Sequence, residues 1–309
     1  MPELWNNVAK TVYHHWRKAL VFSRKQCWNV VNLMPDRPIF IVGCSRAGTT
    51  LVYKTFSESR ELGTLQKETH EFWAGLHPLS DRNWSSHALA AEDASNQDRL
   101  VASCYFYSRT GKRRFVDKNN QNGLCIPYLY TLFPNAYFVY VKRNPGDNIN
   151  SLMEGWRRPD EFASWSGEMP EEVSIDGGSI TRWCFFLPEG WRGYLSSSLE
   201  EVCAFQYQAM NASILEAKSG IPHRQWTEIC YEDLLEDPVA CFESAFKDCD
   251  IAFTQELERH CSSVLEKPYN AFSEIKQHKW LHGRNRECIE KVLPSTREIA
   301  ARLGYSGVC

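Results

Sequence analysis

Residues 38–50, with the sequence PIFIVGCSRAGTT, constrain the fold of this chain more than any other stretch. Residues 39–43 are apolar and rich in β-branched side chains, which predicts a buried strand that ends at Gly43. A short polar turn follows, and Gly48, Thr49 and Thr50 begin a helix predicted over residues 50–59. A strand joined to a helix by a glycine-containing turn is typical of an α/β fold whose turn faces an anion.

The turn itself has the chemistry of an anion site, although an ordinary tight turn is the alternative. Backbone N–H groups at a helix start carry about +0.5 of an elementary charge, and glycines 43 and 48 let the backbone approach phosphate oxygens. Arg46 adds a planar set of donors suited to phosphate or sulfate. The common ATP-binding loop, G-x-x-x-x-G-K-[ST], has lysine where this chain has Thr49. The predicted contacts of the bound anion are Cys44, Ser45, Arg46, Ala47, Gly48, Thr49 and Thr50.

Three more strands are predicted, at residues 115–117, 137–142 and 226–231, and helical patterns at 121–133 and 200–217 alternate with them. This alternation predicts an α/β fold, a single domain with a central parallel β-sheet flanked by helices. Ligands bind beyond the carboxyl ends of the strands in such sheets. We therefore expect the segments that follow residues 43, 117 and 142 to converge.

A second candidate anion site follows the strand predicted at 137–142. Arg143 leaves the end of this strand, and Ser151 follows eight residues later on the next predicted helix. A guanidinium and a hydroxyl at that spacing can bind one further phosphate, although either residue alone is more often structural. The same strand carries no Asp, whereas a P-loop kinase needs one on a neighbouring strand to help hold its metal ion.

Together these stretches resemble the sulfotransferase family that uses 3′-phosphoadenosine 5′-phosphosulfate (PAPS) and releases PAP. Ser45 to Thr50 is similar to the family's loop for the 5′-phosphosulfate, and Arg143, Pro145 and Ser151 are similar to its 3′-phosphate site. The resemblance spans residues 38 to about 303, weakly between 76 and 112 and across 154–191. It implies the P-loop-like sulfotransferase fold and transfer of a sulfuryl group from PAPS without a metal ion.

The resemblance also implies roles for later residues. The stretch FVDKNN places Lys118 at the sulfuryl group, where it and Arg46 would stabilise charge. The stretch CYEDLLEDP places Tyr231 beside the adenine, and HKWLHGR indicates Lys279 and Arg284 over the nucleotide.

The proton acceptor is predicted within QKETHEFW, which is similar to the K-E-x-H-F-F pattern of glycan sulfotransferases. Glu68 matches the glutamate that takes the acceptor proton, and a partly desolvated carboxylate is suited to that task. His70 is the rival base, because histidine titrates near neutrality. Phe72 and Trp73 are expected to contact the acceptor. A solvated charged turn is the alternative for this stretch.

Residues 154–191 interrupt the strand and helix pattern, and we interpret them as a lid or acceptor-binding insertion. They contain eight acidic residues against three arginines, which favours a neutral aromatic or cationic acceptor, unless the acids merely face water. The tryptophans predicted to bind the acceptor are Trp156, Trp165, Trp183 and Trp191.

The chain divides into residues 1–35, a basic amphipathic helical segment, and residues 36–309, the nucleotide-binding domain. Residues 1–35 hold five bases against Glu3, and a helix packed on the body is favoured over a membrane-surface helix or a transit peptide. No apolar run reaches the ~20 residues of a membrane span. The twelve cysteines form no C-x-x-C pair. We expect a cytoplasmic protein without a metal site, a transmembrane segment or a nucleic-acid partner.

The sequence thus predicts a PAPS-dependent sulfotransferase that modifies a hydroxyl or amine of a small natural product, such as a guanidinium alkaloid. A glycan or protein-tyrosine sulfotransferase is the alternative within the family. A P-loop nucleotide kinase and a non-catalytic nucleotide-binding protein are the alternatives outside it.

Overall fold

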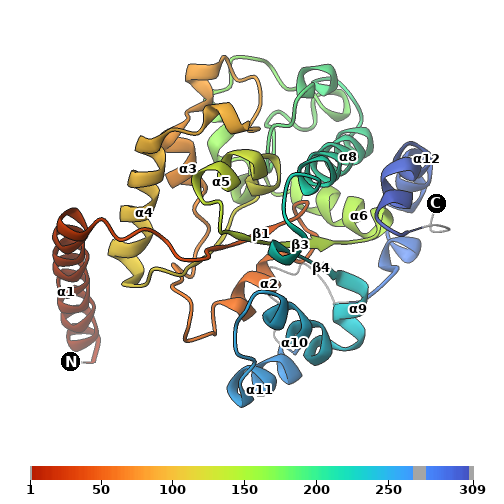
Figure 1. Ribbon diagram of the computed structural model, residues 1–309. Helices are drawn as coiled ribbons and strands as arrows, with labels where there is room; N and C mark the ends of the chain where they lie inside the picture. The colour runs from red at the N-terminus through yellow and green to blue at the C-terminus, as the bar shows by residue number, and fades with distance from the viewer. Residues whose placement is uncertain (1, 267–275, 306–309) are drawn as a thin grey trace.

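The computed structural model describes residues 2–266 and 276–305, which form an α/β fold around one parallel sheet (Figure 1). The strands are β1 (Ile39–Val42), β2 (Val116–Lys118), β3 (Tyr137–Lys142) and β4 (Trp226–Cys230), in the order β2-β1-β3-β4. All three strand pairings are parallel, and Phe40 lies in register between Asp117 and Phe138. The predicted fold class and the positions of all four predicted strands are confirmed.

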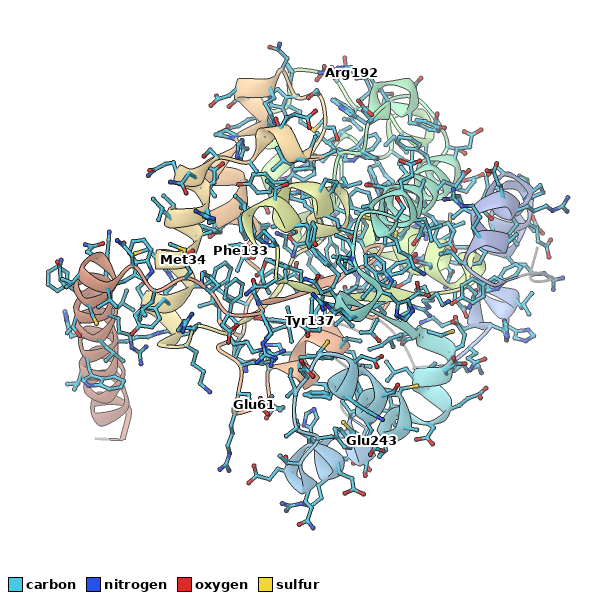
Figure 2. The ribbon with its side chains drawn as sticks, viewed as in Figure 1. Met34, Glu61, Phe133, Tyr137, Arg192 and Glu243 are labelled. Carbon is cyan, nitrogen blue, oxygen red and sulfur yellow. The ribbon has the colours of Figure 1, made fainter. Side chains whose placement is uncertain are left out.

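Side-chain alternation along β1 explains why helices cover both faces of the sheet. Ile39 and Ile41 enter one apolar core, and Phe40 and Val42 enter the other. The first core is closed by α2 (Thr49–Phe56), α9 (Tyr231–Glu236), α10 (Pro238–Asp248) and α11 (Gln255–Ser263). The second is closed by α3 (His70–Leu76), α4 (Asn96–Thr110), α5 (Ile126–Leu132), α6 (Pro145–Trp156), α8 (Leu199–Lys218) and α12 (Arg286–Arg302). Figure 2 shows the two layers, with Arg192 and Glu243 on opposite sides of the sheet.

The first helix, α1 (Pro2–Val31), contacts the body along α4 and otherwise stands apart from it (Figure 1). The helix predicted within residues 1–35 is therefore present. Among the described residues, no helix combines the length and apolarity needed to cross a bilayer.

The tryptophan-rich insertion is part of the second core. It contains the short helix α7 (Pro159–Phe162) and several single turns. Trp156, Trp183 and Trp191 have no exposed surface, and their indole nitrogens donate to Gln206 Oε1, the Phe186 carbonyl and the Trp84 carbonyl at 2.8–2.9 Å. The prediction that these three tryptophans contact the acceptor is not supported, because they are covered on every side and their polar atoms are already bonded.

Candidate active site

The loop between β1 and α2 requires glycine at two positions. Gly48 has φ 103°, and a Cβ there would lie 2.5 Å from Tyr231 Cδ2. A Cβ on Gly43 would lie 2.5 Å from the Val141 carbonyl oxygen of β3. The loop backbone is thus held between β3 and Tyr231, and α2 begins directly after Gly48. Its N–H groups lie at the positive end of a helix, which favours an anion.

The two candidate anion sites lie side by side. Arg46 Nε donates to Ser151 Oγ at 3.3 Å, and Arg143 Nη1 donates to the carbonyl oxygen of Arg46 at 3.0 Å. Asn148 Nδ2 donates to the Ser45 carbonyl at 2.8 Å and fixes α6 to the loop. The carboxyl ends of β1 and β3 therefore converge as the topology requires. We call this arrangement of the loop, Arg143 and Ser151 the anion cradle.

The electrostatics of the anion cradle favour a negatively charged ligand. Burial, and then repulsion by Arg143, lowers the pKa of Arg46 to about 10. Burial, and then the charge of Arg143, also lowers the pKa of Lys279, with a smaller contribution from Arg46. Within the described residues, the buried atoms Arg143 Nε and Ser45 Oγ have no hydrogen-bond partner. Mutually repelling cations beside unsatisfied donors form a site that a bound phosphate or sulfate would stabilise.

Lys279 reaches the cradle because Asp147 holds the segment around it. The Asp147 carboxylate accepts from the backbone N–H groups of His278 at 2.6 Å and Trp280 at 3.4 Å. The Trp280 indole packs on Gly146, where any Cβ would collide with it. We did not predict Asp147 or Trp280 from the sequence, although the pair Gly146-Asp147 directly follows the Arg-Asn-Pro of the second anion site.

Tyr231 and Arg284, both predicted at the nucleotide, have different surroundings. The guanidinium carbon of Arg143 lies 4.3 Å from the centroid of the Tyr231 ring, so this tyrosine forms a wall of the anion cradle. Arg284 instead pairs with Glu154 at 2.6 Å, and 65% of its side chain is exposed. The structure therefore does not bring Arg284 to the anion cradle, because a carboxylate on α6 already binds its guanidinium.

Lys118 and Glu68 form an ion pair at the end of β2. Lys118 Nζ lies 2.5 Å from Glu68 Oε1 and donates to Thr50 Oγ1 at 3.2 Å. The Lys118 side chain is 7% exposed and that of Glu68 is 32% exposed. Because Thr50 belongs to the first turn of α2, the ion pair joins the anion cradle to the candidate base. In the described part of the chain, no group of three or more His, Cys, Asp or Glu residues is placed to hold a metal ion.

Asp117 organises the segment that carries Glu68. It is 1% exposed, and its carboxylate accepts from Thr69 Oγ1 at 2.6 Å, Trp73 Nε1 at 3.0 Å and Asn122 Nδ2 at 3.3 Å. Burial raises the pKa of Asp117, although these donors oppose the shift. Successive strand residues face opposite sides, so Asp117 fixes α3 while Lys118 faces α2. We did not predict this residue from the sequence.

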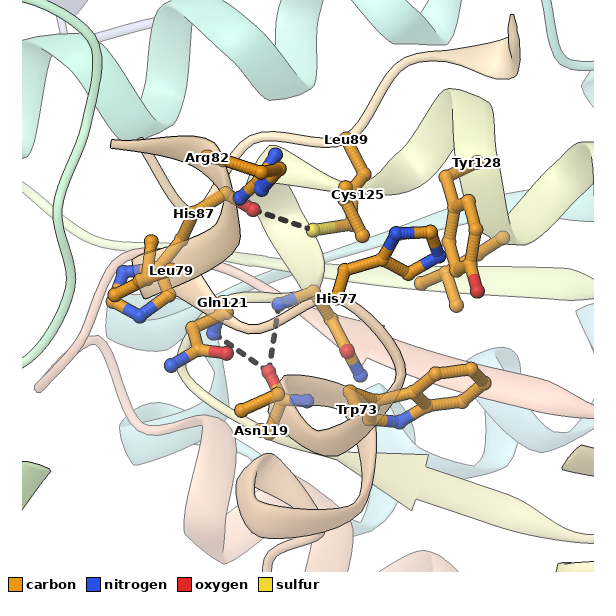
Figure 3. Close-up of a pocket in the computed structure, with 13 residues that line it drawn as sticks. Trp73, His77, Leu79, Arg82, His87, Leu89, Asn119, Gln121, Cys125 and Tyr128 are labelled. Carbon is orange, nitrogen blue, oxygen red and sulfur yellow. Dashed lines mark hydrogen bonds between the residues drawn. The ribbon is translucent and has the colours of Figure 1, made fainter. Parts of the chain in front are cut away.

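The predicted acceptor contacts on α3 are largely occupied by protein. His70 begins this helix and is partly exposed, and its role as the rival base stays a prediction. The ring of Phe72 stacks on Tyr105 with centroids 3.8 Å apart. Trp73 is buried, its Nε1 donates to Asp117, and its side chain lines a cavity of about 20 Å³ (Figure 3). That volume has room for about one water molecule and not for an acceptor.

Two side chains that line this cavity, His87 and Asn119, accept hydrogen bonds from buried backbone N–H groups. His87 Nδ1 accepts from the Leu187 N–H at 2.7 Å and so ties the insertion to the core. Burial lowers the pKa of His87 to about 3. Asn119 Oδ1 accepts from the N–H groups of Gln121 and Asn122 (Figure 3), whereas its Nδ2 has no partner among the described residues.

The insertion contributes to the site through its first part. Phe162 lies with its ring centroid 5.5 Å from the guanidinium carbon of Arg46. Trp165 is partly exposed, and its ring contacts that of His87 at a centroid distance of 4.9 Å. Four of the eight acids form ion pairs with arginines, which reduces the negative charge expected to attract a cationic acceptor; they are Glu154, Asp160, Glu161 and Glu171.

Comparisons with known proteins found sulfotransferases. A model of the sulfotransferase family matches residues 38–255. The sulfotransferase domain from the curacin biosynthetic pathway has 16% identity and a TM-score of 0.51, over 88% of this chain and 99% of that chain. A Mycobacterium avium sulfotransferase has 14% identity and a TM-score of 0.49, over 90% and 81%. A mouse sulfotransferase complexed with PAP has 13% identity and a TM-score of 0.47, over 88% and 91%.

No curated protein sequence matches the chain. The similarity to the curacin-pathway domain, at 16% identity, shows the fold alone. The family is assigned from the matched family model, which covers more than half of the chain and includes the loop, Lys118, Arg143 and Ser151. This protein belongs to the sulfotransferase family.

Proposed function

We propose that the protein transfers a sulfuryl group from PAPS to a hydroxyl or amine of a small molecule. The observation that carries the proposal is the buried guanidinium of Arg143. It donates to the carbonyl oxygen of Arg46, whose side chain contacts Ser151, and its Nε has no partner among the described residues. Arg143 and Ser151 would bind the 3′-phosphate, and Tyr231 would lie near the adenine. The loop, Arg46 and Lys118 would bind the phosphosulfate.

Glu68 is the proposed general base, and its ion pair with Lys118 suggests how it is activated. While Lys118 Nζ donates to Glu68 Oε1, that oxygen is occupied by the ion pair. When the donor's sulfuryl oxygens bind Lys118, the lysine can exchange its bond to Glu68 for bonds to these oxygens. Glu68 would then accept the proton from the acceptor as the acceptor attacks sulfur in line. Lys118 and the loop N–H groups would stabilise charge on the sulfuryl and the departing phosphate oxygens.

The acceptor proposed here is a small molecule with an aromatic or apolar body. Phe72 and Trp165 are partly exposed aromatic side chains at the edge of the second core, and Phe162 lies over Arg46. Four acids of the insertion are paired with arginines and so attract a cation less strongly. We therefore propose a neutral acceptor in preference to a cationic one such as a guanidinium alkaloid.

Calorimetry tests the donor assignment. Adenosine 3′,5′-bisphosphate should bind the full chain more tightly than adenosine 5′-monophosphate or ATP does, and Arg143→Ala should weaken it at least tenfold, because hydrogen bonds to charged groups contribute about 1.5–3 kcal/mol each. Arg284→Ala is the matched control and should leave the affinity within twofold. Equal affinity for the bisphosphate and the monophosphate would rule out a 3′-phosphate site at Arg143.

Turnover with a labelled donor and a panel of hydroxyl and amine acceptors tests the base. Glu68→Gln should lower kcat by about 10²–10⁴-fold, the usual contribution of general base catalysis. The neighbouring exposed residue supplies the control, Glu71→Gln, which should retain activity. If His70→Ala rather than Glu68→Gln abolished turnover, the proton acceptor would be His70.

A further inference from the structure

The outer face of α1 exposes large apolar side chains to solvent. All five large apolar side chains that are exposed in the described part of the chain belong to this helix, at 55–84% exposure; they are Val12, Trp16, Phe22, Val30 and Val31. At about 100° per residue, the first four fall within an arc of roughly 120°. The same arc also carries exposed polar residues, among them Ser23 and Gln26, so its apolar side chains are interspersed with polar ones. We call this arc the apolar stripe, because four large apolar side chains on one helix face mark an interaction site more often than scattered single residues do.

The opposite face of α1 fixes the helix to the body, so the apolar stripe faces outward. Trp28 is buried, and its Nε1 donates to the Leu33 carbonyl at 2.9 Å. Arg24 lies over Gly111 at the end of α4 and donates to the Arg109 carbonyl at 3.5 Å. These contacts, together with the α1–α4 packing in Figure 1, hold the helix in one orientation.

The charge of α1 differs in sign from that of the rest of the molecule. Residues 1–35 hold five bases and one acid, whereas residues 36–309 hold 30 bases and 37 acids. Lys18 and Lys25 are exposed, and helical geometry places them along one edge of the apolar stripe, beside Phe22. An apolar stripe that carries tryptophan and phenylalanine and is flanked by lysines has the composition of a helix that lies in a membrane interface.

We propose that α1 binds the surface of an anionic lipid bilayer. Trp16 and Phe22 would enter the boundary between headgroups and acyl chains, and Lys18 and Lys25 would contact anionic headgroups. The net negative body would be repelled by the same surface and held away from it. A second copy of the chain fits this face less well, because pairing two α1 helices would bring their basic flanks together. The proposal is independent of the proposed function.

Co-sedimentation of the full chain with vesicles tests the proposal. The protein should sediment with vesicles of phosphatidylcholine and phosphatidylserine, about ten times less with phosphatidylcholine alone, and less in 0.5 M NaCl, because each base near an anionic surface contributes about 1 kcal/mol. The double variant Lys18→Gln and Lys25→Gln should reduce binding about tenfold or more, as should Trp16→Ser with Phe22→Ser. These side chains are exposed, so the variants should keep the circular dichroism of the parent.

The matched control removes two exposed bases of α12, with Lys291→Gln and Arg297→Gln, and should bind vesicles like the parent. Equal loss in this control, or no binding to anionic vesicles, overturns the proposal. Light scattering after size exclusion adds a further outcome. A parent dimer that becomes a monomer in Trp16→Ser with Phe22→Ser would assign the stripe to a second copy of the chain and also overturn it.

Discussion

The substitution Asp117→Asn tests whether a buried carboxylate positions the candidate base. Asp117 touches none of the proposed substrates, but it binds Thr69, which directly follows Glu68, and Trp73, one turn further along α3. Asparagine has the same shape and can still accept from Thr69. Its NH₂ group would replace the oxygen that now accepts from Trp73 Nε1 and Asn122 Nδ2.

The expected magnitude follows from those contacts. Asn122 can rotate its amide and offer its oxygen, whereas the indole of Trp73 has no alternative and would be left unpaired. An unpaired buried donor costs about 1–3 kcal/mol, so the free energy of unfolding should fall by about that amount. Because α3 would lose its hydrogen bond through Trp73, the position of Glu68 would be less fixed and kcat should fall at least tenfold. The affinity for adenosine 3′,5′-bisphosphate should stay within twofold, because the anion cradle is built on other strands.

Urea unfolding, calorimetry and turnover measured on the same preparations separate these effects. A double-mutant cycle with Trp73→Phe should give a coupling free energy of about 1–3 kcal/mol, because the phenylalanine removes the same hydrogen bond and keeps an aromatic ring. If Asp117→Asn lowered stability but left kcat unchanged, Asp117 would be a core residue only. If the free energy of unfolding did not change, the hydrogen bond from Trp73 to Asp117 would not stabilise the folded chain.

Three further predictions follow from the site. The pKa of His87 is about 3 in the folded chain and about 6.5 in the unfolded chain, so only the unfolded chain takes up this proton between pH 7 and pH 5. The free energy of unfolding should therefore fall by about 2 kcal/mol over that range. Urea unfolding as a function of pH should show a smaller decrease in His87→Asn. Gly48→Ala should weaken adenosine 3′,5′-bisphosphate binding at least tenfold by calorimetry, because the new methyl group meets Tyr231; an unchanged affinity would contradict the loop assignment. Arg284→Ala should change the free energy of unfolding by less than about 1 kcal/mol, since its pair with Glu154 is largely exposed, and a larger loss by urea unfolding would mean the pair is structural.

Local patterns were enough to predict the sheet and the approach of Arg143 to the glycine loop. The strand at residues 137–142 and the glycine loop have few alternatives, because side-chain alternation and turn chemistry are set within a few residues. The rule that ligands gather at the carboxyl ends of parallel strands then predicted that Arg143 would approach the loop. The contact between Arg46 and Ser151 follows from the same topology.

The features that the sequence did not predict depend on distant partners. A run of tryptophans has the same composition whether it lines a binding site or fills a core, and only the packing of α6 and α8 decides that Trp156 and Trp183 are covered. Arg284 was expected at the nucleotide, yet Glu154, 130 positions away, binds it. The role of Asp117 was not predicted, because its three hydrogen-bond donors come from other segments of the chain.

The burial of the insertion has a consequence for redesigning the enzyme. Transplanting residues 154–191 from a relative would not exchange a peripheral module; it would replace part of the interior, with three indoles to be refitted at once. Under the proposed function, changes to substrate preference are better sought on α3 and in the segment after β2. There, Phe72 and Asn120 are partly exposed, and new side chains can be tried one at a time on an intact scaffold.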